Sequence, residues 1–412
     1  MMRKVRKWKV LVTDGDALHS LAIVRSLGSK GMRITVSSRR KITSHLSLSF
    51  YSRYCRRRLF YPDPETREAQ FIHFLEEELK LNKYDILLPV RSTVTPLVAK
   101  HEEKLRKYAN FVIPSKQSME IANNKEETFK FAEKIGIPIP KTFYPQDIGE
   151  IEQAIKELSF PLVVKAPFGA GSTGVSYVET KERLFSVFDK YFAVQKSGRD
   201  KKPMVQELIR GNGYGFFSIF DHGEPKAIFM HKRIREYPIT GGPSTVAESY
   251  YNERLKELGL KILRKLEWNG VAMVEFKLDE KDNEFKLMEV NPKFWGSLNL
   301  AIASGVDFPY FFCLQAMGEK YEPVFEYKKG VRFRWLIPGD LMHGWAYFLE
   351  HYRFPKGFFK DLFADTVKYD ISLSDPKPAI LEIFYIAGYL YRNRLKIRYP
   401  FGNPFEKDKD LA

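Results

Sequence analysis

The sequence contains little cysteine and no long hydrophobic run. Cys55 and Cys313 are its two cysteines among 412 residues, which excludes a disulfide framework and predicts a reducing compartment. No CxxC or HxxxH cluster occurs, so a structural zinc site is excluded as well. The longest apolar stretch near the C-terminus, 379–390, includes Glu382 and is shorter than the ~20 residues that span a bilayer.

Nothing near the N-terminus is typical of a targeting segment. The apolar stretch 10–12 stops at Asp14, whereas a signal peptide needs a longer apolar core. This stretch therefore predicts a first β-strand. We expect a cytoplasmic protein, with contact at a membrane surface left open.

Acidic side chains are scarce at the start of the chain. Residues 1–60 hold fifteen Lys and Arg but only two Asp, an excess of 13 within a net formal charge of +16. A nucleic acid, an anionic membrane surface or a polyanionic substrate would explain this excess, and a solvated basic face would too. Because no RNP, KH or zinc-finger signature accompanies the basic patches, we expect no specific nucleic-acid partner.

Strands and helices alternate along the first domain, 1–115. The patterns predict strands at 9–13, 33–37 and 85–90 and helices at 18–30, 71–81 and 95–108. Such alternation predicts a parallel sheet with ligands at the carboxyl ends of its strands, where Asp14, Ser38 and Arg91 lie. The GxGxxG motif is absent, so this domain is not predicted to bind a dinucleotide.

Three oxygen-bearing side chains mark a predicted hairpin of strands 270–278 and 283–290. Glu289 and Asn291 are two residues apart and share one face of an extended chain, and pairing brings Glu275 across to it. Two carboxylates and an amide suit Mg²⁺, whose coordination is usually completed by substrate phosphates. Surface carboxylates would be the alternative, but both strands are otherwise apolar.

A glycine-rich loop, 167–175, follows a predicted strand that ends at Lys165. Small residues let backbone N–H groups approach phosphates closely, and the lysine can place a cation on them. The loop lacks the Walker A order, and by itself it could be an ordinary hairpin turn. Together with the hairpin that carries the three oxygen-bearing side chains, the loop indicates a binding site for a nucleoside triphosphate and a metal ion.

These motifs, in their order and spacing, resemble the ATP-grasp superfamily over about residues 10–315. The matching segments are the pair 124–125, the segment 136–140, the strand 163–165, the loop 167–175, the segment 205–211 and the segment 287–292. The pair 124–125 lies within a single helix predicted over 115–135. Segments 237–244 and 292–297 resemble the predicted carboxylate–amine ligases of that superfamily, near the D-aspartate ligases. The implied fold is α/β, with a Rossmann-like pre-ATP-grasp domain (1–115), a small lobe (116–204), a large lobe (205–320) and a C-terminal extension (321–412).

The resemblance also implies residue roles around ATP and Mg²⁺, with Mn²⁺ as an alternative cation. Lys125 and Lys165 would hold the α- and β-phosphates, and Glu275, Glu289 and Asn291 would bind the metal. The loop residues that would close over the β- and γ-phosphates are Gly169, Gly171, Ser172, Thr173 and Gly174. The adenine would meet the side chain of Gln206 and the backbone of the hinge formed by Glu207, Leu208 and Ile209.

The implied reaction is ATP-dependent ligation of a small carboxylate and an amine through an acyl phosphate. The segment 231–244 is the best candidate for substrate contact, although a basic hairpin with a glycine turn would have the same sequence. His231, Arg233, Arg235 and Lys293 are the candidate catalytic residues, with His231 the candidate base. A kinase or carboxylase that uses the same nucleotide site is the alternative, and so is a nucleotide-binding protein at an anionic membrane surface.

The stretch 379–394, rich in aromatic and basic residues, could lie on a membrane surface. Packing on the ligase core or in a homodimer interface is the simpler expectation.

Overall fold

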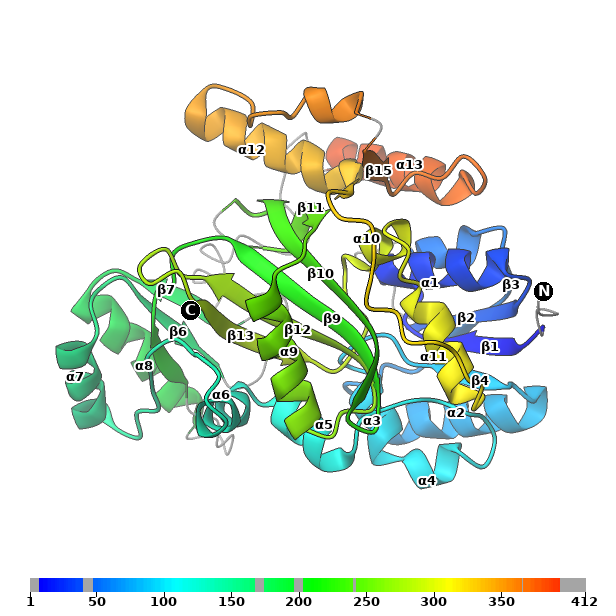
Figure 1. Cartoon of the computed structure of the whole chain (residues 1–412), viewed down its shortest axis with the longest axis horizontal. Helices are drawn as coiled ribbons and strands as arrows, with labels where there is room; N and C mark the ends of the chain where they lie inside the picture. The colour runs from blue at the N-terminus through cyan, green and yellow to red at the C-terminus, as the bar shows by residue number, and fades with distance from the viewer. Residues whose placement is uncertain are drawn as a thin grey trace. The chain divides into compact units, whose positions relative to one another are not determined.

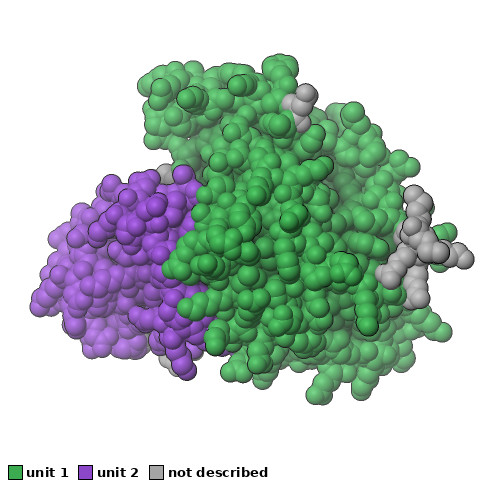
Figure 2. Space-filling view, in the orientation of Figure 1, with its two compact units in different colours: residues 1–119, 216–273, 291–397 green, residues 120–215, 274–290, 398–412 purple. Residues whose placement is uncertain are grey.

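The computed structural model describes residues 7–39, 47–166, 174–195, 203–239, 242–364 and 366–392. By its internal contacts the chain forms two compact units, coloured separately in Figure 2. Unit 1 comprises residues 1–119, 216–273 and 291–397, and unit 2 comprises residues 120–215, 274–290 and 398–412. The division of the chain into four domains stays a prediction.

The first part of unit 1 is a four-stranded parallel sheet, drawn in blue and cyan in Figure 1. Its strands, in the spatial order β3-β2-β1-β4, are β1 (Lys9–Val12), β2 (Arg33–Arg39), β3 (Cys55–Tyr61) and β4 (Ile86–Leu88). The accompanying helices are α1 (Leu18–Ser29), η1 (Leu48–Tyr51), α2 (Glu68–Asn82), α3 (Thr95–Lys100) and α4 (Glu102–Leu105). The predicted alternation is thus present, although the helix expected over 95–108 is interrupted at His101.

Strand β3 was missed by the sequence patterns because three of its seven residues are consecutive arginines. Its burial alternates poorly, since Arg56, Arg57 and Arg58 are all exposed while Tyr61 is fully buried. Charged residues are common on edge strands, where they discourage pairing with another sheet. Edge strands of this kind carry little hydrophobic periodicity, which is the signal that sequence analysis uses.

The small sheet of unit 2 has four antiparallel strands in the order β5-β8-β6-β7. They are β5 (Thr142–Phe143), β6 (Leu162–Lys165), β7 (Val175–Val178) and β8 (Met204–Glu207). The neighbouring helices are α6 (Lys125–Lys134), α7 (Ile148–Glu157) and α8 (Lys181–Gln195). Apolar side chains of the strands and of α7 and α8 form a separate core, which includes Ile151, Val164 and Phe188.

A seven-stranded sheet has the order β13-β12-β9-β10-β11-β14-β15. Its strands are β9 (Gly213–Asp221), β10 (Glu224–Glu236), β11 (Ser244–Ser249), β12 (Gly270–Leu278), β13 (Phe285–Asn291), β14 (Arg332–Arg334) and β15 (Val367–Tyr369). The remaining helices are α9 (Glu253–Lys265), α10 (Leu298–Ala303), α11 (Phe308–Ala316), η2 (Leu336–Asp340), α12 (Leu341–His351), η3 (Lys360–Leu362) and α13 (Lys377–Arg392). The predicted hairpin of β12 and β13 is confirmed.

The C-terminal extension contributes two strands to this sheet. Strand β14 pairs with β11 in antiparallel register, and β15 pairs with β14 in parallel register. The carboxylate of Asp375 is buried and bonds to Arg25 and Ser52, far earlier in the chain. Residues 321–392 are therefore integrated into unit 1.

The single helix expected over 115–135 is wrong, because Asn124 divides it into α5 (Lys116–Asn123) and α6. Asn124 has extended backbone angles, φ −105° and ψ 111°, and its side chain accepts hydrogen bonds from the backbone N–H groups of Glu126 and Glu127. This is the geometry of a helix N-cap, which satisfies N–H groups that have no partner within the helix. The division makes Lys125 the first residue of α6.

We expect Asn124→Ala to destabilise the protein by about 1 kcal/mol, because the cap of α6 is lost. The measurement is the shift of the urea unfolding midpoint. The neighbouring Asn123→Ala is the matched control and should cost less than about 0.5 kcal/mol, since Asn123 caps no helix. Equal shifts for the two variants would contradict the capping role.

Candidate active site

Four of the side chains predicted from the sequence come together in unit 2. Lys165 ends strand β6, and burial lowers the pKa of its ammonium to about 8, with the nearby Lys125 and Lys277 ammonium groups lowering it further. The carboxylates of Glu289 and Glu275 oppose this shift. The Nζ atom of Lys125 lies 3.9 Å from Oε2 of Glu289. Two ammonium groups and two carboxylates therefore share one half-buried region.

The position of Lys125 is not explained by the stability of its helix. The N-terminus of a helix carries partial positive charge and disfavours a cation there. Lys125 is nevertheless the first residue of α6, and its side chain is only 12% exposed. The carboxylate of Glu289 compensates this charge, so the lysine is held where a further anion would also be attracted.

Strand β12 presents two kinds of side chain on its two faces. Ala272, Val274 and Phe276 are fully buried in the core. Glu275 and Lys277 alternate with them and are half-buried. Because successive side chains of a strand point to opposite faces, the core packing of the apolar set fixes the charged set on the other face.

The hinge predicted to meet adenine is held by hydrogen bonds. Gln206 is buried, and its amide nitrogen donates to Oγ1 of Thr142 at 2.7 Å. Glu207 bonds twice to Lys141, through its backbone N–H and through its carboxylate, which accepts from the Lys141 N–H at 2.8 Å. The Nζ atom of Lys277 donates to the carbonyl of Ile209 at 3.2 Å.

The glycine-rich loop is described only at its end. Gly174 has a φ of +78°, which favours glycine, and its carbonyl accepts from the N–H of Ala166 at 2.8 Å. This bond links the ends of strands β6 and β7 around the loop. Gly169, Gly171, Ser172 and Thr173 lie outside the described residues, so their contacts with phosphates stay predictions.

In unit 1, His231 lies on strand β10 and is buried. Its ring packs edge-on against Phe217, and neither ring nitrogen has a hydrogen-bond partner among the described residues. Burial, together with the nearby Arg233, lowers the pKa of the imidazole to about 3. A base with this pKa is poorly matched to proton abstraction at neutral pH, which argues against the predicted role of His231 as general base.

Arg235 belongs to a buried ion cluster. Its guanidinium bonds to both carboxylate oxygens of Asp340, at 2.9 and 3.1 Å, and to Asp361 at 2.8 Å. Arg334 is fully buried and bonds to the same Asp340. Removing one member of such a pair would leave an uncompensated charge in the interior. We therefore replace the expectation that Arg235 contacts substrate with a structural role.

Arg233 and Lys293 have more accessible surroundings than Arg235. Arg233 lies 3.5 Å from Glu236 and donates to the carbonyl of Gly242 at 3.4 Å. Gly242 cannot be replaced by a larger residue without movement, because an added Cβ would lie 2.3 Å from the carbonyl oxygen of Tyr237. Tyr237 and Gly242 are thus in close contact beside Arg233.

Lys293 approaches the carboxyl edge of the parallel sheet, where the sequence predicted ligands. Its Nζ donates to Oγ of Ser92 at 3.3 Å, and Ser92 lies four residues after the end of β4. Burial lowers the pKa of the nearby His19 to about 3, and the charges of Arg91 and Lys293 lower it further. Arg91 also forms an ion pair with Asp16 at 3.0 Å. The sequence patterns placed Arg91 at a strand end, but they gave no reason to expect His19 near it, because His19 belongs to no recognisable motif.

Two family models match the chain over adjoining ranges. The model described as "ATP-grasp in the biosynthetic pathway with Ter operon" matches residues 202–337. The model described as "Carbamoyl-phosphate synthase L chain, ATP binding domain" matches residues 124–211. Together these ranges hold the two lysines, the hinge and the two carboxylates that the structure places in unit 2. Residues 124–337 belong to the ATP-grasp superfamily.

Known ATP-grasp proteins align with about half of this chain in sequence. The carbamoyl phosphate synthase large chain of Clostridium acetobutylicum is 23% identical over 193 residues, 45% of this chain and 18% of that protein. The D-alanine–D-alanine ligase B of Clostridium tetani is 24% identical over 205 residues, 44% of this chain and 55% of that protein. The chain therefore spans under a fifth of the first relative and about half of the second.

Solved structures share the ATP-grasp fold over most of the chain. A biotin carboxylase–βγ-ATP complex from Campylobacter jejuni has a TM-score of 0.65 at 16% identity and covers 80% of this chain and 75% of its own. The L-amino acid ligase of Bacillus licheniformis has a TM-score of 0.57 at 17% identity, covering 76% and 74%. At such identities the likeness establishes the fold alone.

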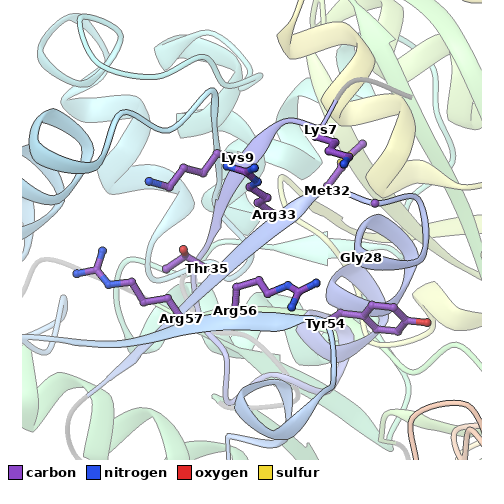
Figure 3. Close-up of a pocket in the computed structure, with 10 residues that line it drawn as sticks. Lys7, Lys9, Gly28, Met32, Arg33, Thr35, Tyr54, Arg56 and Arg57 are labelled. Atoms are coloured by element: carbon purple, nitrogen blue, oxygen red, sulfur yellow. The ribbon is translucent and has the colours of Figure 1, made fainter. Parts of the chain in front are cut away.

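The chain also has a cavity of about 550 Å³ in unit 1 (Figure 3). It lies where β1, β2 and β3 begin, at the opposite edge of the sheet from Lys293. Five basic side chains line it, namely Lys7, Lys9, Arg33, Arg56 and Arg57. Part of the basic excess of residues 1–60 is therefore gathered around one cavity, but Arg57 is neutralised by Glu78.

The charges around Lys165 give a prediction with opposite signs for two variants of this ATP-grasp protein. Glu289→Gln should lower the pKa of Lys165 below about 8, because a carboxylate that stabilises the ammonium is removed. Lys125→Gln should raise that pKa, because a repelling charge is removed. The measurement is a pH titration of the NMR signals of ¹³C-labelled lysine side chains, with the exposed Lys156→Gln as an unaffected control. Shifts of the same sign for both variants would contradict the assigned geometry.

Proposed function

We propose that this protein is an ATP-dependent ligase that joins a small-molecule carboxylate to an amine, with release of ADP and phosphate. The observation that carries the proposal is the grouping of Lys125, Lys165, Glu275 and Glu289 in unit 2. Phosphoryl transfer depends mainly on positioning and on compensating charge. Ammonium groups beside carboxylates supply donors for phosphates and oxygen ligands for a metal.

ATP would occupy unit 2. Lys125 and Lys165 would bind the α- and β-phosphates, and the loop from Gly169 to Gly174 would cover the β- and γ-phosphates. The adenine would lie against the hinge that contains Gln206 and Ile209. The amide nitrogen of Gln206 already donates to Thr142, so the adenine would use mainly the backbone of the hinge.

Magnesium fits the donor set of β12 and β13, the two strands at one edge of the seven-stranded sheet. Glu275 and Glu289 lie on the adjacent strands β12 and β13, and Asn291 is two residues beyond Glu289 on β13. No group of three or more acidic, histidine or cysteine side chains converges within the described residues. Phosphate oxygens of ATP would therefore complete the coordination, as is usual for Mg²⁺. When bound, Mg²⁺ or Mn²⁺ would offset the negative charge of the transferring phosphoryl group.

The reaction would proceed in two balanced steps. A carboxylate oxygen attacks the γ-phosphorus, the bond to the ADP oxygen breaks, and an acyl phosphate forms. An amine nitrogen then attacks the acyl carbon, phosphate leaves with the electron pair of the broken C–O bond, and the amine loses a proton. Arg233 and Lys293 are the cations we propose for the substrate carboxylate, with Arg91 beside Lys293.

A carboxylase or kinase reaction at the same nucleotide site is the second candidate. The fold likeness to a biotin carboxylase favours it as much as the likeness to an L-amino acid ligase favours ligation. The two reactions differ in whether ADP release needs an amine. A nucleotide-binding protein without catalysis would not use two carboxylates beside the phosphate-binding lysines. A homodimer is compatible with each of these proposals.

Incubation with MgATP and pools of carboxylates and amino acids should yield ADP and phosphate only when a carboxylate and an amine are both present. With an ¹⁸O-labelled carboxylate, one labelled oxygen should appear in the released phosphate, because that oxygen bridges the acyl phosphate. Mass spectrometry of the phosphate measures the transfer. AMP and pyrophosphate as products would refute the acyl-phosphate route, and ADP formation with bicarbonate but no amine would favour the carboxylase.

The nucleotide site can be tested separately by the variant Lys165→Met. We expect its affinity for MgATP to fall about ten- to a hundredfold, because a charge-assisted hydrogen bond to phosphate is lost. Isothermal titration calorimetry gives the affinity. Lys156→Met removes an exposed lysine of the same unit as a control, and equal affinity for the two variants would remove Lys165 from the site.

A further inference from the structure

The exposed apolar side chains of this protein are concentrated in its C-terminal segment. Among the described residues nineteen large hydrophobic side chains are exposed, and fourteen of them lie between residues 341 and 391. Single exposed hydrophobic residues are normal on a soluble protein, but large contiguous groups mark a surface that meets a partner or a membrane. This segment thus has a surface whose chemistry the nucleotide site does not explain.

Helix α12 turns an apolar stripe outward. Leu341, Trp345 and Leu349 are spaced by four residues and are 49%, 48% and 58% exposed. Other sides of α12 are packed, since His343 and Gly344 are buried and an added Cβ on Gly344 would lie 2.6 Å from the ring of Phe358. The outward stripe is therefore a property of the folded helix and not of an unpacked segment.

Helix α13 repeats the pattern. Ile380, Ile383, Phe384 and Tyr391 follow helical spacing and are 49%, 48%, 69% and 85% exposed. Both α12 and α13 contact η2, and Figure 1 shows them in orange and red on one side of unit 1. Between them in sequence lies an aromatic cluster, in which the ring of Phe354 is 4.9 Å from that of the exposed Phe359. We refer to the exposed apolar residues of 341–391 as the C-terminal face.

The charges of the same segment are mainly positive. Five basic residues of the segment are exposed, namely Arg353, Lys356, Lys360, Lys368 and Lys377. Of the acidic residues described there, only Glu350 is exposed, and Asp361 and Asp375 are buried in ion pairs. Burial and the neighbouring Asp370 raise the pKa of Glu382 to about 8, so this carboxyl adds little negative charge at neutral pH.

Aromatic and aliphatic side chains edged by lysines suit an anionic lipid surface better than a protein. The cores of protein interfaces are depleted in lysine, because burying an ammonium group is costly. At a bilayer, apolar groups enter the headgroup region while lysines remain near the lipid phosphates. No helix among the described residues is long and apolar enough to cross a membrane, and α13 has 16 residues.

We propose that the C-terminal face binds the surface of an anionic lipid bilayer, with α12 and α13 lying in the plane of the headgroups. This binding is independent of the proposed ligase activity. It would keep the protein beside substrates that are attached to, or made at, a membrane. The ligand chemistry is an extended lipid surface with anionic phosphate headgroups.

Trp345 provides a specific probe of this proposal. The other four tryptophans, Trp8, Trp268, Trp295 and Trp335, are at most 8% exposed. Vesicles of phosphatidylcholine with one third phosphatidylglycerol should shift the fluorescence of the full chain to shorter wavelength, and brominated lipids should quench it. Trp345→Phe should abolish the fluorescence change while leaving co-sedimentation with the vesicles largely intact.

Co-sedimentation of matched variants separates the apolar and charged contributions. Leu349→Ser/Phe384→Ser should weaken binding at least about tenfold, whereas Leu81→Ser, which removes an exposed leucine elsewhere, should not. Lys356→Gln/Lys360→Gln should weaken binding by roughly ten- to thirtyfold, less so at high salt. Lys80→Gln/Lys107→Gln removes the same charge from exposed positions outside the C-terminal face and is the control.

Three results would overturn the proposal. The first is an absence of sedimentation with the anionic vesicles at low salt, and the second is equal loss of binding in test and control variants. The third is a fluorescence shift of Trp345 that follows protein concentration without lipid, because it would assign the face to a second copy of the chain. Melting temperatures of all variants should stay near that of the native protein, since every substituted side chain is exposed.

Discussion

Two ammonium groups cannot share a half-buried region unless negative charge accompanies them. Lys125 and Lys165 influence each other in unit 2, and Glu289 and Glu275 compensate them. The depressed pKa of Lys165 shows that this compensation is incomplete, because burial and repulsion outweigh the two carboxylates. Such a site attracts a polyanion that arrives with its own divalent cation. The phosphates would pair with the two ammonium groups, and the divalent cation would pair with the two carboxylates. Each charged side chain of the site would then have a partner of opposite charge.

A second set of buried charges holds the C-terminal segment on unit 1. Asp340 binds Arg235 and Arg334, and Asp361 binds Arg235 and Arg332. Buried ion pairs contribute little net stability, but the loss of one partner leaves a buried charge uncompensated and is strongly destabilising. The ion pairs therefore favour this one packing of the C-terminal segment over others. Because Arg235 lies near the end of β10, the C-terminal segment fixes the end of that strand. The segment therefore has two sides, one that supports the core and one that exposes the C-terminal face.

The ATP-grasp fold by itself does not select a reaction. Structures with similar folds include a carboxylase and an amino acid ligase, and a fold supports many chemistries through the side chains placed on it. In our proposal the nucleotide side of this chain is specified by Lys125, Lys165 and the two glutamates. The substrate side rests on fewer observations, namely the positions of Arg233 and Lys293 in unit 1. The choice between an amine and another acceptor thus depends on residues outside the family motifs.

The sequence alone determined the elements that have strong local signals. The β12–β13 hairpin, strand β6 ending at Lys165 and the helices α1 and α2 could be predicted because hydrophobic periodicity and turn residues are local properties. The edge strand β3 was hidden by its arginines, and the break at Asn124 was hidden because a cap residue and a helical residue look alike inside an apolar pattern. Only the tertiary structure decided the roles of Arg235 and His231. Arg235 forms ion pairs with Asp340 and Asp361, which are distant in sequence, and His231 is buried against Phe217, which lies on another strand. The same reason applies to the C-terminal face, because a helical stripe becomes exposed or buried only when the rest of the chain has packed against its other side.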